Sequence, residues 1–161
     1  MAAIYPVALP QVYGYLLPRC GSVALAEDLT AETFMAAVAA CRRHPAPRVT
    51  VAYLIGIARH KLVDHWRRAE REHRGLAAVD PEQSVGEDPW SELLDAQAAH
   101  AALLQLSLPQ RTALTLRYLD GLSVPEVARH LDRSVHATET LLVRARSALR
   151  RVYQEGEHHA A

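Results

Sequence analysis

The sequence predicts an all-α protein made of two small helical domains joined by an acidic linker. Apolar residues recur at helical spacing along most of the chain, and no long run alternates polar and apolar residues as a strand would. Stretches rich in proline or glycine interrupt this periodicity at residues 44–47 and 75–89. The second interruption coincides with a change in charge, and it therefore marks the boundary between the two domains.

The composition excludes several classes of protein. Half of the 161 residues are hydrophobic and 22% are charged, which is typical of a chain that buries a core and argues against disorder. No apolar run approaches the roughly 18–20 residues of a membrane span, and the N-terminus lacks the pattern of a secretory signal. Cys20 and Cys41 form no CxxC pair and no disulfide framework. Together these features predict a cytoplasmic protein.

The formal net charge of zero conceals an asymmetry along the chain. Residues 1–76 carry ten Lys and Arg against six acids, and residues 101–161 carry eight Arg against six acids. Residues 77–100 carry six acids and neither Lys nor Arg. Two basic blocks joined by an acidic one suggest two modules that bind a polyanion, joined by a linker that does not bind it. Solvated faces that happen to differ in charge would give the same asymmetry, so charge alone leaves both interpretations open.

Two helices are predicted after the first twenty residues. The first spans residues 22–43, has Ser22 in the N-cap position, and ends at the prolines of residues 44–47. The second spans residues 50–74 and is amphipathic, with apolar residues on one side. Its opposite side carries a polar stripe that ends strongly cationic: His60, Asp64, Arg67, Arg68 and Arg71. Such a basic helix could hold single-stranded nucleic acid by phosphate contacts and by stacking on Trp66, although an aromatic residue at this spacing is more often part of a core.

Proline, glycine and charged residues predict the linker and the two helices after it. Residues 77–90 are acidic and contain proline and glycine, which predicts an extended, solvated segment. A helical pattern then runs from Trp90 to about Leu106. Ser107 and Pro109 mark the start of a further helix that continues to residue 118 or 119.

The C-terminal segment predicts a helix-turn-helix. Ser123 and Glu126 match a capping box that starts a short helix ending at Leu131. A three-residue turn follows, and Ser134 caps a last helix that runs to about Tyr153. Residues expected to pack the two helices together are Val127, Ala128, Leu131, Leu142, Ala145 and Leu149. The second helix of such a motif enters the major groove, whereas a plain helical hairpin would show similar spacing.

Blocks in both halves of the chain resemble bacterial RNA polymerase sigma factors. Residues 26–34, AEDLTAETF, resemble the AEDLTQETF motif of region 2, and residues 53–68 resemble the WLxxIARNxxxDxxRR stretch that follows it. Residues 106–123 resemble the LPxxxRxxxxLRYxxGLS opening of region 4. Regions 2 and 4 joined by a short linker are the layout of the extracytoplasmic-function (ECF) subgroup.

The resemblance implies that the two halves of the chain have different roles. Residues 1–76 would bind core polymerase and the −10 element, residues 77–90 would be the linker, and residues 91–161 would bind the −35 element. The residues implied in docking on the clamp helices of the polymerase β′ subunit are Asp28, Leu29, Glu32 and Phe34. The resemblance places the loop 44–50 where ECF factors capture a flipped base of the −10 element. A pocket there must offset the stacking free energy that the flipped base loses.

The resemblance also implies the DNA contacts. Those for the −10 strand are Arg59, His60, Lys61, Asp64, Arg67 and Arg68, and those for the −35 duplex are His136, Glu139, Thr140, Val143 and Arg144. Some positions depart from the family pattern: His60 replaces asparagine, Glu139 replaces a basic residue, and Leu141 replaces arginine. A carboxylate such as that of Glu139 can accept from cytosine N4 but repels phosphate, so an altered −35 preference is expected. Asp132 stands in place of the usual turn glycine, which is tolerable because aspartate visits the left-handed region.

The sequence therefore predicts an ECF-type sigma factor that directs core polymerase to promoters and helps open them. The expected partners are core RNA polymerase, through its β′ and β subunits, promoter DNA, and an anti-sigma factor that is often membrane-tethered in the family. No catalytic residue, metal site, cofactor or small-molecule substrate is expected, since no established ligand spacing or phosphate loop is present. Two alternatives stay open: a free-standing helix-turn-helix regulator that dimerises on DNA, and a sigma-like decoy that binds polymerase or an anti-sigma factor without opening promoters.

Overall fold

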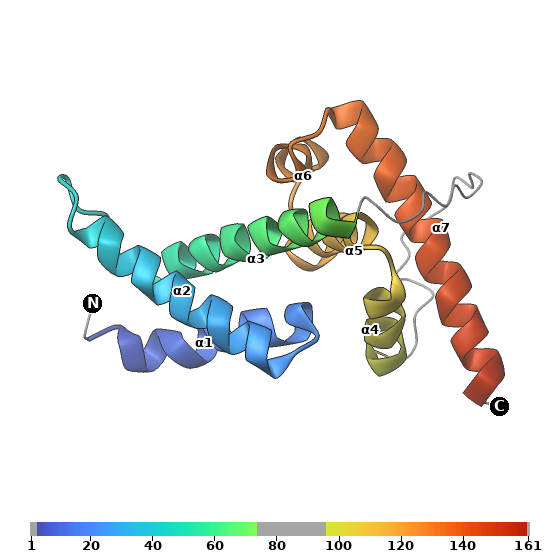
Figure 1. Ribbon diagram of the computed structural model, residues 1–161, viewed down its shortest axis with the longest axis horizontal. Helices are drawn as coiled ribbons and strands as arrows, with labels where there is room; N and C mark the ends of the chain where they lie inside the picture. The colour runs from blue at the N-terminus through green and yellow to red at the C-terminus, as the bar shows by residue number, and fades with distance from the viewer. Residues whose placement is uncertain (1–2, 74–95, 161) are drawn as a thin grey trace. The chain divides into compact units, whose positions relative to one another are not determined.

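The computed structural model describes residues 3–73 and 96–160, and these residues are almost entirely helical (Figure 1). The elements are α1 (Tyr5–Cys20), α2 (Val23–Cys41), α3 (Val51–His73), α4 (Ala96–Gln105), α5 (Leu108–Leu114), a π-helical segment η1 (Thr115–Leu119), α6 (Val124–Leu131) and α7 (Val135–Ala160). No strand occurs in the described ranges, so the predicted all-α class is confirmed. Two compact units are present, Met1–His65 and Trp66–Ala161. The predicted linker 77–90 lies outside the described residues.

Helix α1 is the element that sequence patterning missed. It contains Pro10 and Pro18, and proline inside a helix removes a hydrogen bond to the carbonyl four residues earlier. Both prolines are exposed, so water can reach the carbonyls they leave unbonded. The opposite side buries Ala8, Val12, Leu16 and Cys20, each four residues apart. Burial of this stripe outweighs the unfavourable local sequence.

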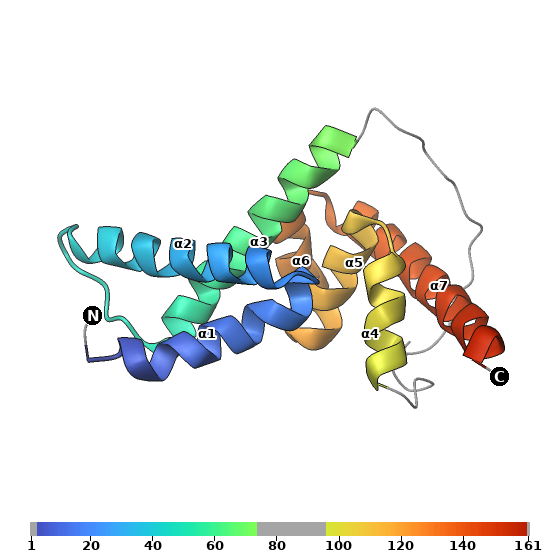
Figure 2. The ribbon, with the colours of Figure 1, turned by 60° about the horizontal axis from the view of Figure 1, so that its bottom comes forward.

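Helices α1 and α2 lie side by side in the first unit (Figure 2). Gly21 joins them with a φ of 69°, a left-handed conformation that glycine adopts without strain. The Ser22 side chain accepts from the Leu25 amide at 3.4 Å, which confirms the predicted N-cap. The rings of Tyr5 and Phe34 meet edge to face, with centroids 4.9 Å apart. The packed α1–α2 pair therefore fixes which side of α2 remains exposed.

Two threonines on the packed side of α2 are buried without leaving a hydroxyl unsatisfied. Thr30 donates to the Ala26 carbonyl and Thr33 donates to the Leu29 carbonyl, each at 2.7 Å. A buried hydroxyl without a partner costs free energy, so these bonds allow a polar residue in the core. Their methyl groups then pack as apolar surface.

Helix α3 begins after the loop of residues 42–50. The Tyr53 amide donates to the Thr50 hydroxyl at 3.1 Å, which caps its first turn. Leu54, Ala58 and Leu62 form its buried row, as the apolar periodicity predicts. The part of α3 up to His65 belongs to the first unit, and the part from Trp66 onward belongs to the second.

The second unit contains the predicted helix-turn-helix. The Glu126 carboxylate accepts from the Ser123 amide at 2.8 Å, and the Ser123 hydroxyl accepts from the Glu126 amide at 3.4 Å, so the capping box is confirmed. Asp132 ends α6 in the left-handed region, and the Ser134 hydroxyl accepts from the Ala137 amide at 3.1 Å to start α7. The residues predicted to pack α6 on α7 are all buried: Val127, Ala128, Leu131, Leu142, Ala145 and Leu149.

Two boundaries in the second unit differ from the predicted ones. The helix expected over residues 107–119 changes from α to π at Thr115, where the Asp120 amide donates to the Thr115 carbonyl at 3.0 Å. A π-helical turn has no apolar repeat of its own, so the sequence pattern could not reveal it. Helix α7 continues to Ala160, past the predicted end near Tyr153.

Candidate polymerase and nucleic-acid interface

Helix α2 places the predicted docking residues on two different sides. Asp28 is exposed and Glu32 is half-buried at the surface, so both carboxylates can be reached from solvent. Leu29 and Phe34 are only 4% and 8% exposed, because they pack in the core of the first unit. The exposed side of α2 is therefore acidic, and the two apolar residues hold the helix in place.

A groove of about 500 Å³ lies between α1 and α2 in the first unit. Its lining is mainly apolar and aromatic: Tyr5, Leu9, Pro10, Tyr13, Thr30, Ala31, Phe34 and the one acid Glu27. Glu27, the acid in its lining, is exposed. This surface combines an apolar hollow with negative charge at its edge.

The predicted −10 residues follow the polar stripe of α3. His60, Asp64 and Arg68 are exposed, and Arg59, Lys61 and Arg67 are half-buried. The Lys61 ammonium lies 3.4 Å from the Glu32 carboxylate, which brings one predicted DNA contact next to one predicted polymerase contact. Because such a pair at the surface is weak, Lys61 stays available for a phosphate.

The loop before α3 adds further positive charge. Arg42, Arg43 and Arg48 are exposed, as is His44. The loop thus presents three guanidinium groups, which can take phosphate oxygens in a bidentate manner. The loop therefore adds positive charge to the first unit.

Trp66 is part of a core and is not an exposed stacking platform. It is 2% exposed, and the Arg111 guanidinium lies over its ring, 5.6 Å from the centroid. A cation above an indole is a favourable arrangement that adds to the burial of the ring. The core interpretation of Trp66 therefore holds in this structure.

Helix α7 presents the predicted −35 residues at its N-terminal end. They are His136, Glu139, Thr140, Val143 and Arg144, spaced i, i+3, i+4, i+7 and i+8 along one side of the helix. His136 and Glu139 are exposed, and the other three are half-buried. The Thr140 hydroxyl donates to the His136 carbonyl at 3.1 Å, so its oxygen can still accept. This side of α7 lies opposite the packed row of Leu142, Ala145 and Leu149.

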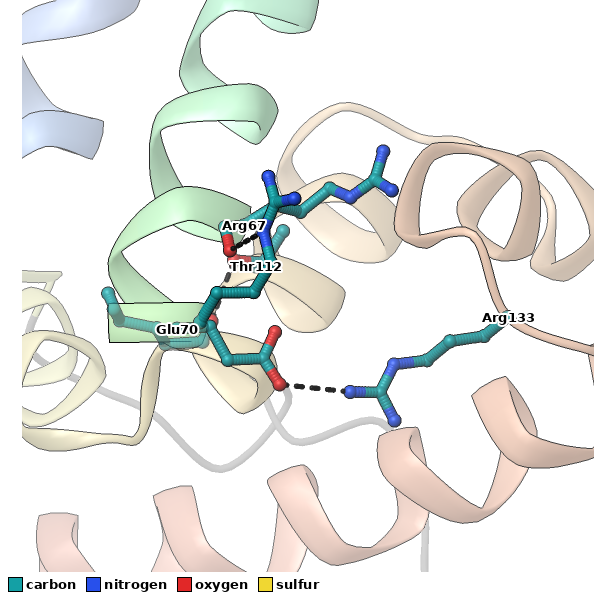
Figure 3. Close-up of polar contacts among 6 residues, drawn as sticks. Arg67, Glu70, Thr112 and Arg133 are labelled. Atoms are coloured by element: carbon teal, nitrogen blue, oxygen red, sulfur yellow. Dashed lines mark hydrogen bonds and ion pairs between the residues drawn. The ribbon is translucent and has the colours of Figure 1, made fainter. Parts of the chain in front are cut away.

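A cluster that the sequence did not suggest lies within the second unit. The Arg67 guanidinium pairs with the Asp132 carboxylate at 3.3 Å, and the Arg133 guanidinium pairs with the Glu70 carboxylate at 3.2 Å. Figure 3 shows the second pair, with Arg67 on the same stretch of α3 as Glu70. More than sixty residues separate the partners along the chain, so no local pattern could have revealed the cluster.

Two further properties of the described residues bear on function. None of their helices is both long and apolar enough to cross a bilayer. Within the same ranges, no three His, Cys, Asp or Glu side chains gather as ligands of a metal ion would.

The fold and these surfaces define a two-unit helical protein of the sigma-70 type. The family model described as Sigma-70 region 2 matches residues 7–72, and the model described as Sigma-70, region 4 matches residues 96–149. The two matches cover the acidic side of α2, the basic stripe of α3 and the helix-turn-helix in one chain. Similar proteins narrow the sigma-70 class to one subgroup.

The ECF RNA polymerase sigma factor BldN of Streptomyces coelicolor is 35% identical over 146 residues, which cover 88% of this chain and 55% of BldN. The chain thus spans about half the length of that relative. The probable RNA polymerase sigma-C factor of Mycobacterium bovis is 33% identical over 128 residues, covering 79% of this chain and 69% of the relative. The chain belongs to the ECF family of RNA polymerase sigma factors.

A solved structure has the same fold. It contains the sigma factor RpoE in complex with the anti-sigma factor NepR from Bartonella quintana. The likeness has a TM-score of 0.58 at 23% identity and covers 95% of this chain and 96% of that one. It supports the all-α architecture.

Proposed function

We propose that this protein directs core RNA polymerase to promoters that carry a −35 and a −10 element, and that it assists opening of the duplex. The single observation that carries the proposal is the combination, in one chain of the ECF family, of an acidic exposed side on α2, a basic stripe on α3 and a capped helix-turn-helix. A regulator that used only the helix-turn-helix would have no need of the region 2 part. Family membership therefore favours the sigma function over a free-standing regulator.

In this proposal, residues 1–76 bind polymerase and the −10 element, residues 77–90 are the linker, and residues 91–161 bind the −35 element. Asp28 and Glu32 supply the exposed carboxylates that meet the polymerase clamp helices. Leu29 and Phe34 contribute by packing, because their burial keeps the acidic side of α2 in place. The apolar groove beside this side of α2 offers additional surface to the same partner.

The −10 strand is held along α3 by Arg59, His60, Lys61, Asp64, Arg67 and Arg68. Guanidinium and ammonium groups neutralise phosphates, which supplies affinity that depends on salt and hardly on sequence. The loop of residues 44–50 receives the extruded base. Sequence preference then comes from base contacts, and phosphate contacts set the register.

The −35 duplex is read by His136, Glu139, Thr140, Val143 and Arg144 from the N-terminal end of α7. The exposed carboxylate of Glu139 accepts a hydrogen bond from a cytosine amino group in the major groove. The same charge repels phosphate, so this position favours specificity over affinity. Substitution of Glu139 would therefore change which −35 sequence is preferred.

Catalysis belongs to the polymerase in this proposal, and the chain itself is not an enzyme. The protein acts in the cytoplasm, where polymerase and promoters meet. The solved neighbour is held by an anti-sigma factor, and we expect an anti-sigma partner here that covers the same polymerase-binding and DNA-binding surfaces. Release from that partner would activate transcription.

Run-off transcription tests the proposal. Purified core polymerase is supplied with this protein on a library of genomic promoter fragments, and the transcripts are sequenced. New start sites that share two elements with a fixed spacing are the expected result. Binding to core without new starts would indicate a decoy, and absence of core binding would contradict the sigma function. The variant Glu32→Ala should lose core binding, whereas Glu155→Ala, an exposed change on α7, is the matched control.

A further inference from the structure

The groove between α1 and α2 has the size of a small-molecule site. Its volume of about 500 Å³ falls in the range of roughly 300–1,000 Å³ that ligand pockets occupy. The two helices pack against each other within the first unit, and Figure 2 shows them side by side. Each lining residue named above lies on one of these two helices. One helix pair therefore sets the shape of the groove.

Helix α1 contributes an aromatic row to the groove. Tyr5, Leu9 and Tyr13 follow one another at four-residue intervals, so they share one side of the helix and extend over about 12 Å. Tyr5 is 46% exposed, and its ring meets that of Phe34 on α2 edge to face, with the centroids 4.9 Å apart. This contact holds a large ring at the groove without burying it. The α1 wall of the groove is thus aromatic and partly open to solvent.

Helix α2 contributes the acidic and hydroxyl oxygens. Its lining residues share one side of the helix and are Glu27, Thr30, Ala31 and Phe34. The Thr30 hydroxyl donates its hydrogen to the Ala26 carbonyl at 2.7 Å, so its oxygen is left as an acceptor. The Glu27 side chain is exposed, and an ionised carboxylate only accepts hydrogen bonds. Both groups therefore suit a ligand that donates.

Positive charge is absent from this lining within the part of the chain that the structure describes. The single charged residue of α1 is Arg19, whose guanidinium lies over the Tyr15 ring, 4.0 Å from its centroid. Arg19 also donates to the Tyr15 carbonyl at 2.8 Å, and it does not belong to the lining. The groove thus offers aromatic rings, hydrogen-bond acceptors and one negative charge.

We propose that the groove binds a small organic cation in which an ammonium group is attached to an apolar body. Aromatic faces attract a cation, and the Glu27 carboxylate adds an ion pair. The apolar body covers Leu9, Pro10 and Ala31 and removes their surface from water. An anion would be repelled by Glu27, and a neutral ligand would gain nothing from its charge. The site goes beyond the function proposed above, since neither polymerase nor DNA takes part in it.

The first test compares three probes that share one apolar body: phenylbutylamine, phenylbutanol and phenylbutyrate. At neutral pH they are a cation, a neutral molecule and an anion. Chemical-shift titration of the isotope-labelled full chain by NMR measures each affinity. The amine should bind about five- to twentyfold more tightly than the alcohol, from an ion pair and a contact with aromatic rings. The carboxylate probe should bind more weakly than the alcohol. Equal affinities, or no saturable shift with the amine, would overturn the proposal.

A charge substitution tests the role of the carboxylate. Glu27→Gln should weaken binding of the amine about two- to fivefold and leave the alcohol unaffected, because the carboxylate attracts only the charged probe. The control Glu72→Gln removes an exposed acid from α3, outside the lining, and should leave both affinities unchanged. An equal loss in the two variants would show a general effect of net charge and would refute the site.

Two further substitutions test the walls of the groove. Tyr5→Leu keeps an apolar side chain and removes the ring, so it should weaken the amine about two- to fivefold more than the alcohol. Ala31→Phe adds a large side chain at an exposed position in the lining and should abolish binding of both probes. Thermal unfolding verifies that each variant is folded. Unchanged binding of the amine to a folded Ala31→Phe protein would contradict the proposed site.

Discussion

At the scale of single residues, the turn between α6 and α7 shows how one backbone angle supports the helix-turn-helix. Asp132 is the one residue other than glycine with a positive φ among those that the structure describes, and this conformation costs a residue with a Cβ roughly 1–2 kcal/mol. Aspartate is tolerated there because its short polar side chain suits the left-handed region. The contact that the exposed carboxylate makes with Arg67 recovers only a small part of that cost.

The turn gives a prediction that compares two variants lacking the carboxylate. Asp132→Ala should destabilise the protein by about 1 kcal/mol relative to Asp132→Gly, because alanine pays the strain of the left-handed conformation and glycine does not. Both variants lose the pair with Arg67, so their difference isolates the backbone. Urea unfolding followed by circular dichroism measures it. Equal stabilities would show that the turn relaxes when the carboxylate is removed.

A second prediction at this scale concerns the cap of α6. Ser123→Ala should lower the free energy of unfolding by about 1 kcal/mol, since it removes the acceptor for the Glu126 amide at the start of a helix of only eight residues. Ser123→Thr keeps a hydroxyl in the same position and should lose only a few tenths of that value. Thermal unfolding of the three proteins compares them. A loss in the threonine variant as large as in the alanine variant would show that the hydroxyl is not the cause.

At the scale of elements, each helix that the sequence predicts well carries its own start signal. The N-cap of α2 and the capping box of α6 are local, and the structure contains both. Helix α1 escaped prediction because its prolines hide a buried stripe, and η1 escaped because a π-helical turn leaves no periodic trace. Local capping residues thus predict where helices begin, whereas α1 and η1 depend on burial against neighbouring elements.

For the candidate sites too, local sequence patterns predict only what lies on a single helix. The acidic side of α2 and the −35 side of α7 follow from spacing along one helix, so the sequence could predict which residues share a side. The ion pairs Arg67–Asp132 and Glu70–Arg133 join residues 65 and 63 positions apart, and no spacing rule connects them. Whether Leu29 and Phe34 lie at the surface also depends on α1, the helix that patterning missed. Contacts that are distant in the chain therefore required the structure.

The two sides of α2 predict opposite effects of substitution. Leu29→Ala should lower the free energy of unfolding by about 2–5 kcal/mol because it opens a cavity in the core of the first unit. Asp28→Ala, on the exposed side one residue earlier, should leave stability unchanged within about 0.5 kcal/mol and weaken binding to core polymerase. Unfolding curves and a pull-down with purified core separate the two effects. Unchanged core binding in a folded Asp28→Ala protein would remove that residue from the proposed interface.

At the scale of the whole molecule, the proposed function divides recognition between two DNA elements that different helices would contact. Basic residues of α3 would supply phosphate contacts for one element, and the N-terminal end of α7 would supply base contacts for the other. Phosphate contacts contribute affinity that falls with salt, and base contacts contribute discrimination. In the proposed function the promoter is thus selected by a sum of two kinds of interaction, and each kind has its own experimental signature.

This division makes a prediction about the complete complex with core polymerase. Arg68→Ala should weaken binding to all promoters alike and reduce the slope of log affinity against log salt by about 0.7–0.9, the value of one phosphate contact. His136→Ala should weaken binding mainly to promoters with the preferred −35 element and leave the salt slope unchanged. In the double variant the two losses of binding free energy should add within about 0.5 kcal/mol, because the proposed function places the two residues on separate parts of the DNA. Filter binding at several salt concentrations measures the affinity and the salt slope of the two single variants and the double variant. A combined loss well below the sum would mean that one contact forms only when the other is in place, and that the two elements are recognised as a single unit.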